Sequence, residues 1–156
     1  MQATHINPFV EAVYELFDTK LHGRVERGSI GVTGGNGPGD VLAIIGISGL
    51  RRGTVSIGFP TPTALAVVGR LLGSPVAQMD EAVSNGVAEI VTIVAGNAKG
   101  KLNAESDRLL DLSVPMVVCG ERYNVQQPSK SVWLEVPFKS ELGGFILRVT
   151  FETILK

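Results

Sequence analysis

The segment spanning residues 81–102 constrains the fold most, because apolar side chains recur in it at helical spacing without a break. At about 100° per residue, these side chains cluster within roughly a third of the helical wheel. The stripe consists of Val83, Val87, Ile90, Val91, Val94, Ala98 and Leu102. A long helix with one continuous apolar stripe has to cover that stripe with other elements, so we predict that the stripe faces the core.

Stretches on both sides of this helix are typical of β-hairpins. Residues 41–47 form an apolar strand, and residues 54–59 alternate as the returning strand after a short glycine-containing turn. Residues 131–138 and 145–152 predict a second hairpin of the same kind. Both hairpins offer an apolar face that the helices can cover.

Two further helices are predicted from their starting residues. One begins at Asn7-Pro8 and the other at Thr61-Pro62. Asn and Thr side chains cap the free amides of a helix, and Pro suits the first helical turn because its missing N–H would be unpaired there. We expect Gly23 and Gly73 to end these helices.

The order of these elements indicates the fold class. Residues 25–32 and 109–119 are predicted to be extended as well, with Pro115 interrupting the second segment. The chain then runs through a helix, strands, two helices and strands, which indicates an α+β fold in which a mostly antiparallel sheet carries helices on one face. We predict a single domain over residues 1–156. A hairpin in each half suggests a possible internal duplication, although the halves share little sequence.

The composition excludes several classes of protein. The chain has 156 residues, of which 44% are hydrophobic, and this content is too high for an intrinsically disordered chain. Its 14 Lys and Arg against 15 Asp and Glu give a net charge of −1, so we predict neither a nucleic-acid nor a membrane partner. We find no apolar run that could span a bilayer and no signal peptide at the N-terminus, and we expect a cytoplasmic protein.

The cysteine and histidine content bears on disulfides and metals. Cys119 is the single cysteine, so it has no partner for an internal disulfide and fits a reducing compartment. Its neighbours Val117 and Val118 are apolar, and we expect a buried thiol. One cysteine and two histidines are too few for the usual structural zinc site, and we predict no metal site in this chain.

The long predicted helix has a second face, opposite its apolar stripe. It carries Asn85, Glu89, Thr92 and Gly96 within about 60° of one another. Glu89 and Thr92 are three residues apart, so their side chains are neighbours on the helix surface. Small residues around one carboxylate favour close docking of another protein. The alternative is a solvated face whose glycines ease packing on a neighbouring helix.

Three segments carry a family resemblance. Residues 6–12 (INPFVEA), 44–49 (IIGISG) and 94–102 (VAGNAKGKL) are similar to the first helix, the first hairpin and the end of the long helix of one family. On these segments the chain resembles the CheX-like proteins, relatives of CheC and FliY that act on phosphorylated chemotaxis response regulators of the CheY type. The resemblance covers most of the chain and implies a CheC-like fold and a homodimer formed by joining sheets.

The family's catalytic signature has an acidic or serine residue, a Glu, an Asn and a Pro, which fall here on Asn85, Glu89, Thr92 and Pro115. Glu89 and Pro115 match the signature, whereas Asn85 and Thr92 depart from it. In the family, the Glu pairs with the active-site lysine of the regulator and the Asn orients the attacking water. The resemblance therefore implies that Glu89 and Thr92 are catalytic, and a Thr hydroxyl can also hydrogen-bond a water.

The resemblance also implies a partner surface and an activity, namely hydrolysis of the aspartyl phosphate of a CheY-type regulator. Asn85, Gly96 and Lys99 are expected to bind the regulator, which supplies the Mg²⁺, so that no cofactor of the protein's own is needed. For Lys99 the alternative is a favourable charge near a helix C-terminus. Because Thr92 replaces the family's Asn, a weak or inactive regulator-binding module is the alternative function. A third possibility is a small α+β dimer in which the long helix has a purely structural role.

Overall fold

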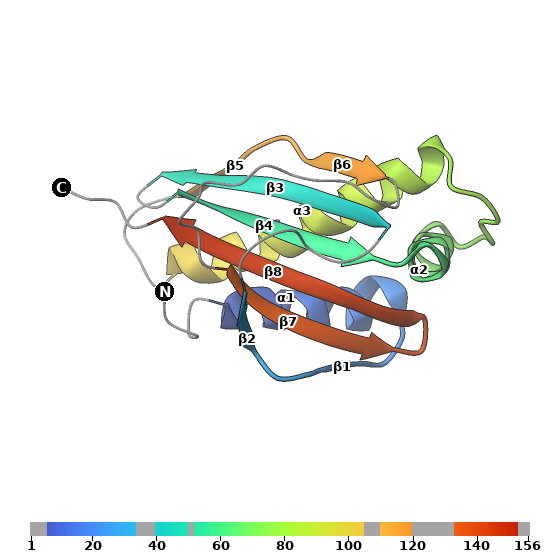
Figure 1. Cartoon of the computed structure of the whole chain (residues 1–156), viewed down its shortest axis with the longest axis horizontal. Coiled ribbons are helices and arrows are strands. Elements are labelled where there is room, and N and C mark those ends of the chain that lie inside the picture. Colours follow the sequence, from blue (N-terminus) through green and yellow to red (C-terminus); the bar gives the residue numbers. More distant parts are fainter. Residues whose placement is uncertain (1–5, 34–39, 50–51, 105–109, 120–132, 153–156) are drawn as a thin grey trace.

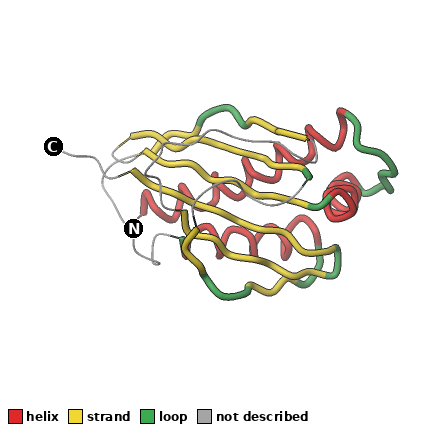
Figure 2. The backbone as a smooth tube through the Cα atoms, in the orientation of Figure 1, coloured by secondary structure: helices red, strands yellow, loops and turns green. Residues whose placement is uncertain are grey.

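The computed structural model describes residues 6–33, 40–49, 52–104, 110–119 and 133–152. A twisted sheet forms one layer, and helices cover one of its faces (Figures 1 and 2). Every pairing between described strands is antiparallel, which confirms the predicted α+β class with its mostly antiparallel sheet.

The two predicted hairpins form the centre of the sheet. They are β3 (Val41–Gly49) with β4 (Arg52–Phe59), and β7 (Trp133–Ser140) with β8 (Gly143–Glu152). Strand β4 pairs with β8, so the hairpins lie side by side and the strand order is β1-β7-β8-β4-β3-β5.

Each edge of the sheet is made of two short strands in succession. On one side, β1 (Val25–Arg27) and β2 (Gly31–Thr33) both pair with β7. On the other side, β5 (Leu110–Leu112) and β6 (Met116–Cys119) both pair with β3. The predicted extended segments are therefore confirmed, but each is broken into two strands.

The helices pack on the sheet face that carries the apolar side chains. They are α1 (Asn7–Leu16), which continues as a π-helical turn η2 (Phe17–Leu21), α2 (Thr61–Leu72) and α3 (Glu81–Ala104). Helices α1 and α3 lie next to each other behind the sheet, and α2 lies at the end where β4 finishes (Figure 1). The predicted stripe of α3 is confirmed, since its residues from Val83 to Ala98 are at most 2% exposed and Leu102 is partly buried against them.

The predicted helix caps are only partly right. Helix α1 begins at Asn7 rather than after it, and no side chain caps it. Helix α2 begins at Thr61, whose N–H and hydroxyl both donate to the Asp40 carboxylate, at 2.9 and 3.0 Å. The capping group therefore comes from the start of β3, a distant part of the chain. At the other ends, His22 and not Gly23 takes the left-handed conformation, while Gly73 ends α2 as predicted.

The expectation of a buried thiol is wrong. Cys119 is exposed, because it lies at the end of the edge strand β6. Its Sγ lies 3.8 Å from the hydroxyl of Ser84 on α3, so this end of β6 runs alongside the first turns of the helix.

Candidate functional site

The exposed face of α3 forms as predicted from the sequence. The helix is capped at its start by Asp80, whose Oδ1 accepts from the Val83 N–H at 3.2 Å. From there, the spacing brings the side chains of Asn85, Glu89 and Thr92 to the outside, and all three are exposed. Gly96 continues the same face one turn further on and is exposed too. The described chain therefore leaves the whole predicted face open.

Glu89 is the one carboxylate of this face. Within the described part of the chain, no hydrogen bond or ion pair engages its side chain. An exposed carboxylate with no internal partner can pair with a cation brought by another molecule. This is the property that the lysine-pairing role requires.

Thr92, one turn further along α3, already uses its proton. Its Oγ1 donates to the Ala88 carbonyl at 2.8 Å, a bond to the residue four positions earlier in the helix. A hydroxyl has one proton and two lone pairs, so Thr92 is left with acceptor capacity only. This bond was not among the predictions from the sequence, although threonines inside helices commonly bond back in this way.

The glycines of α3 separate the two interpretations of its small residues. A Cβ on Gly86 would lie 2.7 Å from Val68 Cγ1 of α2, so Gly86 is needed for packing between these helices. A Cβ on Gly96 or Gly100 would meet nothing within 4 Å. The packing explanation is therefore right for Gly86, but the described chain gives no packing reason for Gly96.

The two lysines near the end of α3 differ in their surroundings. Lys101 pairs with Glu15 and Glu11 of α1. Its hydrogen bond to Glu15 is the largest cause that raises the pKa of Lys101 above the ordinary value, and the nearby charges of both glutamates add to it. Lys99 is half-buried and makes no such pair among the described residues. It follows Gly96 by three residues and so borders the exposed face.

Pro115 of the signature lies between the edge strands β5 and β6, against which α3 packs. It is half-buried, and its neighbour Val114 is 87% exposed. Val114 was not predicted as a site residue from the sequence, although a proline inside an extended pattern is a signal for a bulge or an edge.

No metal site and no membrane span are evident in what the structure describes. Across the described ranges, no group of three or more His, Cys, Asp or Glu side chains could hold a metal ion. No described helix is both long and apolar enough to cross a bilayer.

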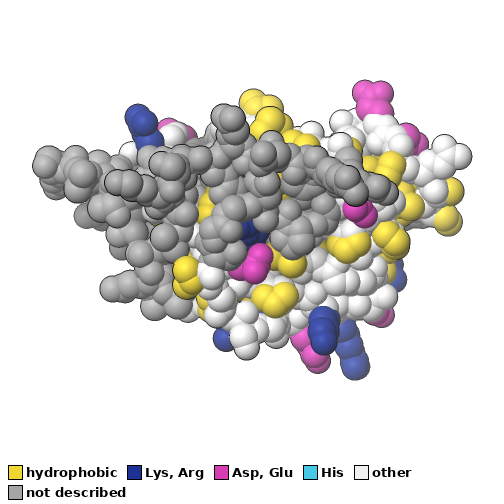
Figure 3. Space-filling model, in the orientation of Figure 1, with side chains coloured by type: hydrophobic (Ala, Val, Ile, Leu, Met, Phe, Trp, Pro, Cys, Tyr) yellow, Lys and Arg dark blue, Asp and Glu magenta, His cyan; other side chains and the backbone are white. Residues whose placement is uncertain are grey.

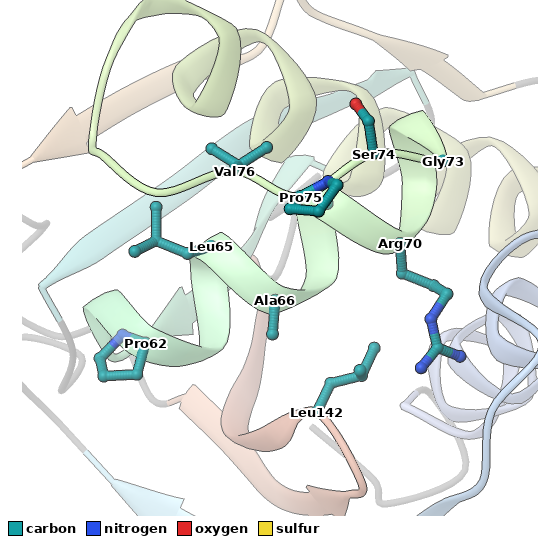
Figure 4. Close-up of a pocket in the computed structure, with 10 residues that line it drawn as sticks. Pro62, Leu65, Ala66, Arg70, Gly73, Ser74, Pro75, Val76 and Leu142 are labelled. Carbon is teal, nitrogen blue, oxygen red and sulfur yellow. The ribbon is translucent and has the colours of Figure 1, made fainter.

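A surface groove of the described chain lies elsewhere, on α2. It has a volume of about 730 Å³ and is lined by α2, by the chain that follows it and by Leu142 of the β7–β8 turn (Figure 4). Arg70 reaches along one end of this groove, where it donates to the Leu21 carbonyl and lies 3.6 Å from the Glu141 carboxylate. None of the residues predicted for the site lines it.

A second, smaller pocket of about 310 Å³ lies on the sheet face that the helices leave uncovered, near Pro60, Pro137 and Ile146. Hydrophobic side chains are visible on this face beside the β7–β8 hairpin (Figure 3). It also lies apart from Glu89 and Thr92, so neither hollow coincides with the predicted catalytic pair.

The comparisons with known proteins agree with this arrangement. Residues 41–139 match the family model described as chemotaxis phosphatase CheX. The chain is 28% identical over 139 residues, or 88% of each chain, to the CheY-P phosphatase CheX of Thermotoga maritima. Among solved structures, it is similar to a CheC-like superfamily protein from Shewanella sp. PV-4, with 28% identity, coverage of 98% of this chain and 100% of the other, and a TM-score of 0.88.

It is also similar to a chain of the CheX–CheY–BeF3–Mg²⁺ complex from Borrelia burgdorferi, with 25% identity, coverage of 96% of this chain and 98% of the other, and a TM-score of 0.81. The family match includes α3 with its exposed face and both edge strands next to it. On this evidence, the chain belongs to the CheX family of chemotaxis phosphatases.

Proposed function

We propose that this protein hydrolyses the aspartyl phosphate of a CheY-type response regulator, and that it acts as one CheX-like domain over its whole length. The observation that carries the proposal is the exposed pair Glu89 and Thr92. Residues three apart on a helix have Cβ atoms about 5–6 Å from each other, so both side chains can enter one pocket of a docked protein.

The reaction needs positioning more than covalent chemistry. The oxygen of a water attacks the phosphorus in line with the leaving carboxylate, the bond between phosphorus and the aspartyl oxygen breaks, and inorganic phosphate and a free aspartate result. The proton that the water loses passes to solvent or to the phosphate. The regulator brings Mg²⁺ and a lysine, which neutralise the charge on the phosphoryl oxygens, so no cofactor of the phosphatase is required.

In this scheme Glu89 pairs with the regulator's lysine. Its carboxylate makes no bond within the described chain, so docking does not have to break an internal ion pair first. Burial of the two charges at the interface strengthens their attraction. Asn85, Gly96 and Lys99 surround this point and are proposed to contact the regulator.

Thr92 orients the attacking water by accepting a hydrogen bond from it. Because the hydroxyl proton is held by the Ala88 carbonyl, the remaining lone pairs have a fixed direction. A carboxamide in this place would also offer N–H donors, which Thr92 lacks. This difference favours slower hydrolysis than an Asn would give, and it keeps a regulator-binding module as the second candidate function.

The test is phosphate release from a CheY-type regulator of the same organism, phosphorylated with acetyl phosphate in the presence of Mg²⁺. Removal of a positioning group from the active site is expected to slow release by roughly tenfold to a hundredfold. We expect this loss for Thr92→Val, which keeps the shape and removes the hydroxyl, while Thr92→Ser retains activity and Thr92→Asn raises it.

Matched controls exist in the same chain. Thr19 is exposed and makes the same type of bond, from its Oγ1 to the Glu15 carbonyl at 2.7 Å, so Thr19→Val should leave the rate unchanged. For Glu89→Gln, which should reduce both binding and rate, the control is Glu26→Gln on β1. Binding without accelerated release would favour the second candidate, and no binding would reject both.

The protein is further proposed to be a homodimer of the kind that the family resemblance implies. Short, two-part strands border both sides of the described sheet and offer unpaired backbone groups to a second copy. Size-exclusion chromatography with light scattering tests this, and a mass of one chain would contradict it.

A further inference from the structure

The edge strand next to α3 contains a bulge. Strand β5 pairs with residues 47–49 of β3, and β6 pairs with residues 41–44. These two registers leave residues 113–115 opposite Ile45 and Gly46. Because Ser113 bonds to Gly46, Val114 and Pro115 lie together opposite the single residue Ile45. Two residues opposite one are the defining feature of a β-bulge, which bends the strand and redirects its side chains.

Ser113 holds this bulge in place. Its N–H donates to the Gly46 carbonyl at 2.9 Å, and its Oγ accepts from the Gly46 N–H at 2.8 Å. The same hydroxyl donates to the Val114 carbonyl at 3.1 Å. The side chain thus replaces a missing ladder bond, and Pro115 is tolerated because a bulge on an edge strand does not need its N–H.

The bulge lies near the level of Thr92 along α3. The contact between Cys119 and Ser84 fixes the end of β6 beside the start of the helix. From there, β6 and α3 run in opposite directions (Figure 1). Going back from Cys119 to Pro115 and Val114 covers about 13 and 17 Å of strand, and these lengths of helix correspond to about nine and eleven residues. Counted from Ser84, this reaches residues 93–95, directly after Thr92 on α3.

The bulge also lies on the matching side of the helix. Ser84 marks the side of α3 that faces β6. On the helical wheel Thr92 is about 80° from Ser84, and Glu89 is about 140° from it. Thr92 is therefore the member of the pair nearer to the edge strand, and the bulge borders the exposed face on that side.

We propose that the Val114–Pro115 bulge forms a second wall of the docking surface, and that it packs on an apolar part of the phosphorylated regulator beside its phosphorylation pocket. This inference rests on the proposed function. Val114 is 87% exposed, which leaves its whole apolar side chain available, and it continues the surface of α3 on which the regulator is proposed to dock. In this proposal the bulge and the exposed face of α3 contact the same regulator.

The test compares exposed valines on the two edges of the sheet. Val114→Asp places a charge on the bulge, and Val32→Asp makes the same change at Val32 of β2, which is 72% exposed on the opposite edge. The probe is a CheY-type regulator of the same organism, in which beryllofluoride and Mg²⁺ take the place of the phosphoryl group on the aspartate. We expect Val114→Asp to weaken binding about tenfold or more, and Val32→Asp to stay within about twofold of the unaltered protein.

Glu89→Gln is measured in parallel, so that the two proposals fail in different ways. Weak binding of Glu89→Gln with full binding of Val114→Asp overturns the bulge as a wall and leaves the proposed function in place. No binding by the unaltered protein overturns both. Light scattering and unfolding curves of each variant accompany the measurement, and a binding loss of Val114→Asp that merely follows a change in mass or stability counts against the inference.

Discussion

Gly86 and Gly96 both lie within helix α3, but their surroundings differ. Gly86 is buried against α2, where Val68 leaves no room for a side chain. Gly96 is exposed, and the space that a Cβ would occupy is empty to 4 Å. Glycine costs a helix about 1 kcal/mol relative to alanine, and only at Gly86 does the described chain offer a packing reason for that cost.

The role of a glycine in this helix therefore depends on which atoms surround the position of its missing Cβ. The packed glycine serves the fold, and its replacement should affect stability alone. The open glycine is part of the face that carries Glu89 and Thr92, and its replacement should separate stability from function. Two changes test this difference, and a third, at Lys101 near the end of the same helix, should have the smallest effect.

Gly86→Ala should destabilise the protein. The added methyl group would lie 2.7 and 2.9 Å from the two terminal carbons of Val68, which is itself fully buried. Such overpacking costs typically 1–3 kcal/mol, and the better helix propensity of Ala recovers about 1 kcal/mol, so we expect a net loss of up to about 2 kcal/mol. Urea unfolding measures it, and phosphatase activity per folded molecule should be unchanged. A variant as stable as the unaltered protein would mean that α2 and α3 can move apart easily.

Gly96→Ala should do the opposite in both respects. Because no other segment of the described chain comes within 4 Å of the added methyl group, it is free of clashes and the helix gains about 1 kcal/mol. The same methyl group would stand on the proposed docking face and should weaken binding of the beryllofluoride-loaded regulator. Gly100→Ala is the matched control, because its Cβ position is equally empty and it lies outside the predicted contact set. Tighter or equal regulator binding by Gly96→Ala would remove this glycine from the interface.

Lys101→Met should have the smallest effect, confined to stability. The Glu15 and Glu11 carboxylates raise the pKa of Lys101 in the folded protein. A raised folded pKa means that the pairing stabilises the protein fully below the pKa of an unfolded lysine and is lost as pH rises through the folded value. Unfolding curves of the two proteins should therefore differ slightly near neutral pH and converge in the alkaline range. Since the pair is partly exposed and screened by solvent, a large difference would be unexpected.

Much of the fold follows from local patterns and could be predicted. The stripe from Val83 to Ala98 repeats every three to four residues, and the strands of both hairpins alternate, so each element carries its own evidence in the order of its residues. The exposure of Asn85, Glu89 and Thr92 follows from the same helical spacing. The resemblance then supplied chemical roles that spacing alone does not contain.

Other features depended on contacts between distant segments. The sequence places Thr61 as a helix cap, but the group that satisfies the start of α2 is the Asp40 carboxylate, brought there by the pairing of β3 and β4. Cys119 has apolar neighbours in sequence, yet it is exposed because β6 is an edge strand.

The sequence by itself determined which faces of the elements are apolar and which residues of α3 turn away from the core, because periodicity within a helix or strand is a local property. Only the tertiary structure decided that Gly86 is crowded while Gly96 is open, and that the end of β6 lies beside the start of α3. These facts depend on how segments far apart in the chain are registered against each other, and the free energy that sets the register belongs to the packed molecule as a whole.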